Sequence, residues 1–147
     1  MKQTLLQAML LLLLATTAAV AAWKLHPRAP ALYQVEEPPR DDERTVAQIQ
    51  KEWQGKVLWL DARTDEEFAK EHIPGARPLN EQHFQQQLFE LLDTLQTIDK
   101  PVVIYCGGQK CEASRKVMEK LKEVVALEQC YVLKGGWPAW QAAQAGQ

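Results

Sequence analysis

One cysteine, Cys106, occupies a position where a thiol can do chemistry. It follows the apolar run Val102–Tyr105 and precedes two glycines, in the segment PVVIYCGGQKCEASR. This order is typical of a strand, a ligand-binding loop and a helix. Backbone N–H groups at a helix N-terminus stabilise negative charge, so we expect a lowered pKa for the Cys106 thiol and a populated thiolate, which is the nucleophilic form.

The competing interpretation is that Cys106 is a small buried side chain that only packs. Gly107 and Gly108 favour a reactive thiol, because glycines let the backbone wrap closely around a ligand.

The elements that must position this thiol are indicated by alternating apolar runs and amphipathic stretches. Strands are predicted at residues 57–60, 77–79, 102–105 and 131–133, and helices at 45–53, 65–70, 84–95, 113–124 and 137–143. Apolar residues on the inner face of the helix after the cysteine loop are expected to be Ala113, Val117, Leu121 and Val124. The order predicts an α/β fold with a mostly parallel central sheet and helices on both faces.

Ligands of such sheets bind outside the carboxyl ends of the strands. Asp61 and Arg63 follow one predicted strand and Cys106 follows another. We therefore expect these three residues to meet at one edge of the sheet.

The beginning of the sequence differs from the rest. Residues 5–22, LLQAMLLLLLATTAAVAA, would form a helix about 27 Å long, slightly shorter than the hydrocarbon core of a bilayer. Residues 1–26 are interpreted as a membrane anchor or as a signal peptide with an A-x-A cleavage site at residues 19–21; a buried core helix is the third possibility. Residues 27–44, rich in proline and charge, are predicted to be a linker, and 45–147 a single domain.

An uncleaved anchor is the favoured interpretation, because Trp23 and Lys24 suit a membrane interface. Lys2 favours a domain on the periplasmic, extracytoplasmic side, although Lys24 and Arg28 oppose that orientation. A cleaved chain would be secreted to the periplasm.

Composition excludes several other classes. The net charge is −2 with both signs interspersed, so no nucleic-acid partner is expected. The sequence has three cysteines and three histidines without a CxxC pair, so neither a metal site nor a cofactor is implied. Cys130, just before the last predicted strand, is expected to be a buried structural thiol.

Four segments in register carry a family resemblance. They are LDAR at 60–63 with EEF at 66–68, HIPGA at 72–76, VVIYC at 102–106 and LKGGWPAW at 133–140. From about residue 46 to the C-terminus, the chain resembles the rhodanese domain family.

The resemblance implies a single-domain sulfurtransferase. The Cys106 thiolate would take a sulfane sulfur from a small donor, thiosulfate or a persulfide, and pass it to cyanide or to a thiol, including a protein thiol. The substrate-binding backbone would be Gly107, Gly108, Gln109, Lys110, Cys111 and Glu112, and the supporting residues Asp61, Arg63, His72 and Arg115. Asp61 and Arg63 would fix the loop's shape or form a solvent-facing ion pair, His72 is expected to be structural, and Arg115 would add positive field or be solvated.

Cys111 departs from the family pattern, which commonly has Arg or Thr at this sixth loop position. The departure weakens the expectation of thiosulfate as donor. Cys111 either fills the loop or allows thiol–disulfide chemistry with Cys106. A membrane-tethered sulfur-carrier or binding module is the other alternative. A phosphatase is disfavoured, because Glu112 stands where a C-x5-R loop needs its arginine.

Overall fold

The computed structural model describes residues 2–25, 38–108 and 112–145 of the chain. Contacts divide the chain into two compact units, residues 1–37 and 38–147.

In the first unit, helix α1 spans Lys2–Leu25. Its segment Gln3–Ala21 is the one stretch of the described chain that is long and apolar enough to cross a membrane, a criterion that an N-terminal signal sequence also meets. Thr16 and Thr17 donate their hydroxyl groups to the carbonyl oxygens of Leu12 and Leu13, at 3.0 and 2.9 Å. These polar groups are therefore satisfied within the helix, as an apolar environment requires.

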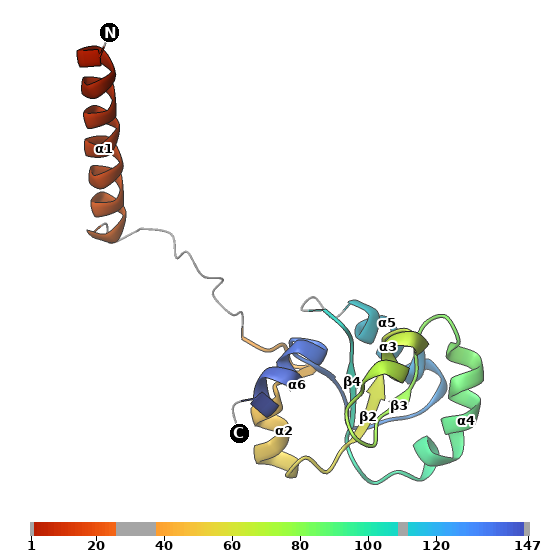
Figure 1. Cartoon of the computed structure of the whole chain (residues 1–147). Helices are drawn as coiled ribbons and strands as arrows, with labels where there is room; N and C mark the ends of the chain where they lie inside the picture. Colours follow the sequence, from red (N-terminus) through yellow and green to blue (C-terminus); the bar gives the residue numbers. More distant parts are fainter. Residues whose placement is uncertain (1, 26–37, 109–111, 146–147) are drawn as a thin grey trace. The chain divides into compact units, whose positions relative to one another are not determined.

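The second unit is an α/β domain with a five-stranded, fully parallel sheet (Figure 1). The strand order is β1-β5-β4-β2-β3. The strands are β1 (Glu43–Arg44), β2 (Leu58–Asp61), β3 (Arg77–Pro78), β4 (Val102–Tyr105) and β5 (Cys130–Leu133). The helices are α2 (Val46–Trp53), α3 (Asp65–Lys70), α4 (Phe84–Thr97), α5 (Glu112–Val124) and α6 (Gly136–Ala145). The predicted fold class is confirmed.

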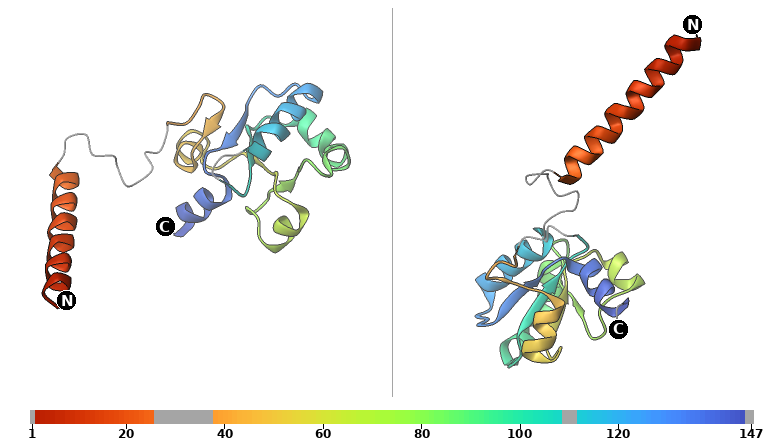
Figure 2. Two further views of the ribbon diagram at one scale, coloured as in Figure 1. Left: turned by 90° about the horizontal axis from the view of Figure 1, so that it is seen from above. Right: turned by 90° about the vertical axis from the view of Figure 1, so that its left-hand side faces the viewer.

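The central strand β4 is buried on both faces, and its side chains alternate between two cores. Val102 and Ile104 belong to the core that contains residues of α4 and α5. Val103 and Tyr105 belong to the core that is completed by α2 and α6. Figure 2 shows these two pairs of helices on opposite sides of the sheet.

Strand β1 was not expected from the sequence, which placed residues 43 and 44 in the linker. The backbone of Val132 donates to Asp42 and that of Lys134 to Arg44, each at 2.9 Å, so the segment is an edge strand against β5. Glu43 and Arg44 are both charged, so the sequence shows no apolar run here. Their pairing with β5 uses backbone groups alone. The linker prediction is therefore wrong at this end, and the second unit begins at Pro38.

The inner face of α5 also needs a correction. Val124 is 59% exposed, whereas Val125, just after the helix, is 6% exposed and packs in the core. The buried face follows Val117 and Leu121 with a step of four residues to 125, as the helical period requires.

Candidate active site around Cys106

Cys106 leaves the carboxyl end of the central strand β4. The residue is 4% exposed, and its Sγ donates to the carbonyl oxygen of Gly108 at 3.3 Å. Gly107 and Gly108 are themselves exposed, and α5 begins at Glu112. Thus the strand, loop and helix follow one another around the thiol. The residues assigned to the rest of the loop, Gln109, Lys110 and Cys111, lie outside the described residues, as does a Cys106–Cys111 bridge.

The end of β2 lies beside the end of β4. Asp61 is in register with Tyr105, and the backbone N–H of Ala62 donates to the Tyr105 carbonyl at 2.8 Å. The segment that carries Asp61 and Arg63 is thereby placed at the same sheet edge as Cys106.

Asp61 and Arg63 form a buried ion pair rather than a solvent-facing one. Their side chains are 0% and 5% exposed, and Arg63 Nη2 lies 2.7 Å from Asp61 Oδ2. The same Nη2 donates to the Glu71 carbonyl at 2.6 Å. Burial opposes the charge of Arg63, but the Asp61 carboxylate raises the Arg63 pKa above its usual value. The guanidinium therefore stays cationic, and the Asp61 carboxylate balances its charge.

The Arg63 side chain of this ion pair packs against the cysteine loop. A methyl group added at Gly107 would lie 3.6 Å from Cδ of Arg63. The Arg63 guanidinium lies 4.4 Å over the ring of Trp137, which is stacked on Trp140. The Arg63 side chain therefore lies between Gly107 of the loop and the ring of Trp137.

The start of α6 supports the loop from another side, a contact that the sequence did not predict. The backbone N–H of Trp137 donates to the Cys106 carbonyl at 2.7 Å. Gly136 has φ +56°, and a Cβ at this position would overlap the Cys106 carbonyl and lie 3.0 Å from that of Gly108. Only glycine allows this approach. No local signal in the sequence reveals this contact, because Gly136 and the cysteine loop are far apart along the chain.

Tyr105 joins the HIPGA turn to the same strand end. Its buried hydroxyl accepts the backbone N–H of Ile73 at 3.2 Å. Burial and the neighbouring Asp61 raise the Tyr105 pKa far above its ordinary value, so the phenol remains protonated.

His72, the first residue of this turn, is exposed, and its contacts are with Phe68 on α3. Its Nδ1 donates to the Phe68 carbonyl at 2.9 Å, and its ring stacks on Phe68. These contacts favour a structural role.

Arg115 forms ion pairs with two carboxylates, which neither of its expected roles included. It forms ion pairs of 2.6 Å with Asp42 and with Glu43. Burial opposes its charge, but the two carboxylates raise the Arg115 pKa. Arg115 thus fastens α5 to β1, and its charge is matched there. The sequence could not indicate this, because it assigned residues 42 and 43 to the linker.

A polar side chain also borders the loop. Oε1 of Glu67, on α3, would lie 3.4 Å from a methyl group added at Gly107. Oε2 accepts the backbone N–H of Thr64 at 3.2 Å, and the Thr64 hydroxyl accepts the N–H of Glu67 at 3.3 Å. This capping box holds the carboxylate beside the residue that follows Cys106.

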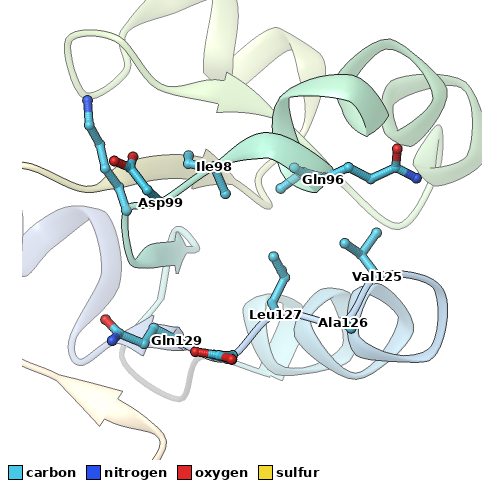
Figure 3. A pocket seen from close by; sticks show the side chains of 10 residues that line it. Gln96, Ile98, Asp99, Val125, Ala126, Leu127 and Gln129 are labelled. Atoms are coloured by element: carbon cyan, nitrogen blue, oxygen red, sulfur yellow. The ribbon is translucent and has the colours of Figure 1, made fainter.

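A groove of about 410 Å³ lies elsewhere, between the C-terminal ends of α4 and α5 (Figure 3). Ile98, Asp99 and Lys100 line one side, just before β4, and Leu127, Glu128 and Gln129 line the other, just before β5. The groove is therefore at the amino ends of these strands, and Cys106 is at the carboxyl end. Within residues 2–25, 38–108 and 112–145, no cluster of three potential metal ligands occurs.

Comparison with known proteins agrees with this architecture. A family model described as a rhodanese-like domain matches residues 45–143. The crystal structure of a rhodanese-like domain protein from Staphylococcus aureus is similar, with 24% identity over 67% of this chain and 90% of that chain, and a TM-score of 0.52. A rhodanese-like domain from Anabaena has 22% identity over 71% of this chain and 76% of its own, with a TM-score of 0.53. A thiosulfate sulfurtransferase from Pseudomonas aeruginosa has 26% identity over 80% of this chain but only 21% of its own, with a TM-score of 0.55. No curated protein matches the sequence.

Proposed function

This chain belongs to the rhodanese-like domain family, and from that premise we propose that it is a sulfurtransferase whose Cys106 carries the transferred sulfur. The observation that carries the proposal is the position of Cys106. The thiol follows the central strand, the loop is fixed by Trp137 and Gly136, and the buried Asp61–Arg63 pair lies at the same sheet edge.

The reaction has two steps that each break one bond to a sulfane sulfur. The Cys106 thiolate attacks the outer sulfur of a donor, and the donor's bond to that sulfur breaks. With thiosulfate, sulfite leaves and a Cys106 persulfide anion remains. An acceptor thiolate or cyanide then attacks the outer sulfur, and the Cys106 thiolate leaves. The covalent intermediate replaces one difficult transfer by two easier ones.

The backbone of residues 107–112 is the proposed binding surface for the outer sulfur or for donor oxygens. The N–H groups at the start of α5 would stabilise their negative charge. Support comes from the exposed glycines 107 and 108, which carry no side chain to block approach.

The experiment is an intact-mass measurement of the purified, reduced chain before and after incubation with thiosulfate. The expected result is a gain of one sulfur atom that is lost in Cys106→Ser and kept in Cys111→Ser. Cys130→Ser is the matched control, because this buried thiol lies in β5 and faces the core. A loss of two hydrogens that requires both Cys106 and Cys111 would instead assign thiol–disulfide chemistry and overturn the proposal.

We also infer that α1 is retained as a membrane anchor with the domain on the extracytoplasmic side. The support is the length and apolar composition of Gln3–Ala21. Protease treatment of intact spheroplasts and of inverted vesicles tests this inference. Digestion of the domain in inverted vesicles alone would overturn the orientation, and a mature N-terminus near residue 22 would overturn the anchor.

A further inference from the structure

The cysteine loop has a fixed negative charge at its edge. The Glu67 carboxylate points one oxygen toward Gly107, while its other oxygen is held by the Thr64 N–H. Glu67 is exposed, so this charge faces the solvent from which a donor arrives. The capping interaction keeps the carboxylate from swinging freely away.

Among residues 38–108 and 112–145, two cations, Arg63 and Arg115, support the loop and its helix, and both are ion-paired. Arg63 is paired with Asp61 beneath the loop, and Arg115 is paired with Asp42 and Glu43 at the side of α5. Their positive charge is therefore largely cancelled at the loop, whereas Glu67 is hydrogen-bonded to neutral groups. Glu112, the exposed first residue of α5, adds a second negative charge next to the loop.

We propose that Glu67 is a specificity-determining residue that disfavours dianionic sulfur donors and selects donors with less charge beside the sulfane sulfur. This inference rests on the proposed sulfurtransferase function. Repulsion from one fixed charge doubles when the donor charge doubles, so a dianion such as thiosulfate is penalised more than a monoanion or a neutral polysulfide. The preferred donor class is therefore an organic sulfane sulfur compound.

Two donors of the same chemistry isolate the effect of charge. Thiosulfate carries two negative charges and releases sulfite, and methanethiosulfonate carries one and releases methanesulfinate. In both cases the Cys106 thiolate attacks the outer sulfur, the bond between the two donor sulfurs breaks, and the same Cys106 persulfide anion forms. The donors therefore differ chiefly in charge and in one substituent.

The test compares kcat/KM for both donors, with cyanide as acceptor, in the full chain and in Glu67→Gln. Glutamine keeps the acceptor oxygen of the capping box, so α3 is expected to remain folded. Glu90→Gln is the control, because it removes an equal charge from an exposed position on α4. At moderate salt we expect Glu67→Gln to raise kcat/KM about two- to fivefold for thiosulfate and by about the square root of that factor for methanethiosulfonate. The gain should appear mainly in KM and shrink as ionic strength rises.

Failure of the inference is distinct from failure of the function. If the unaltered chain transfers sulfur but Glu67→Gln changes both donors equally, or Glu90→Gln has the same effect, the inference is overturned and the function stands. If the unaltered chain gains no sulfur from either donor, the proposed function is overturned, and the inference with it.

Discussion

Replacing Gly136 by alanine should damage both the stability of the domain and the reactivity of Cys106. The added methyl group would overlap the Cys106 carbonyl oxygen and crowd that of Gly108, and both are backbone atoms that cannot rotate away. Alanine at the observed φ of +56° adds about 1–2 kcal/mol of backbone strain, and overpacking adds about 1–3 kcal/mol. We expect the free energy of unfolding to fall by about 2–5 kcal/mol.

To relieve the clash, the loop must move away from residue 136 by roughly the overlap of the two atoms. This movement also weakens the hydrogen bond from the Trp137 N–H to the Cys106 carbonyl. A displacement of about 1 Å at a reacting group lowers a rate by on the order of 100-fold. Urea denaturation followed by circular dichroism gives the stability, and mass spectrometry with thiosulfate gives the rate of persulfide formation.

Gly75→Ala is the matched control for this prediction. Gly75 also has a positive φ, +81°, but a Cβ there meets no atom within 4 Å. The control should therefore show only the backbone strain, with the rate unchanged. Equal destabilisation in the two variants, together with a normal rate in Gly136→Ala, would refute the idea that Gly136 positions the loop.

Three further predictions concern buried or networked charges. Burial raises the pKa of Cys130 to about 11, so at pH 7.5 iodoacetamide should leave this thiol unmodified in the folded chain, and peptide mapping will show whether it does. Asp61→Asn leaves the buried Arg63 guanidinium without its counter-charge and should lower the free energy of unfolding by about 3–5 kcal/mol in urea denaturation, unlike a surface substitution. Burial opposes the charge of Asp65, but hydrogen bonds, first of all with His83, lower the Asp65 pKa. The stability that this carboxylate contributes is therefore present above the unfolded pKa of about 4 and is lost as the pH falls below it. The urea midpoint of Asp65→Asn should accordingly fall less between pH 5.5 and pH 3 than that of the unaltered chain.

Local sequence patterns were sufficient to predict the central strands and the helices beside them. The apolar run before Asp61 and the run before Cys106 predict the two central strands, and the helices predicted at 45–53 and 65–70 correspond to α2 and α3. Because parallel strands align their carboxyl ends, the sequence also brought Asp61 and Cys106 to one edge.

Contacts between distant backbone segments could not be predicted in this way. Strand β1 is held by backbone hydrogen bonds to β5, so its charged side chains give no signal. The partners of Arg115 were missed for the same reason, since both belong to that segment. The contact of Gly136 with Cys106 also depends on the packing of α6 against the sheet.

The attachment of β1 to β5 has a consequence for how the protein is made. The first strand of the sheet pairs with the last, and the N–H that fixes the Cys106 carbonyl belongs to Trp137, which comes after that last strand. During synthesis from the N-terminus, the ribosome therefore releases α1 and most of the sheet well before the segment that closes the sheet and contacts Cys106. Closing a long loop must precede these contacts, which slows completion of the fold. Until residues 130–137 have emerged, β4 lacks its partner β5 and the Cys106 carbonyl lacks the N–H of Trp137.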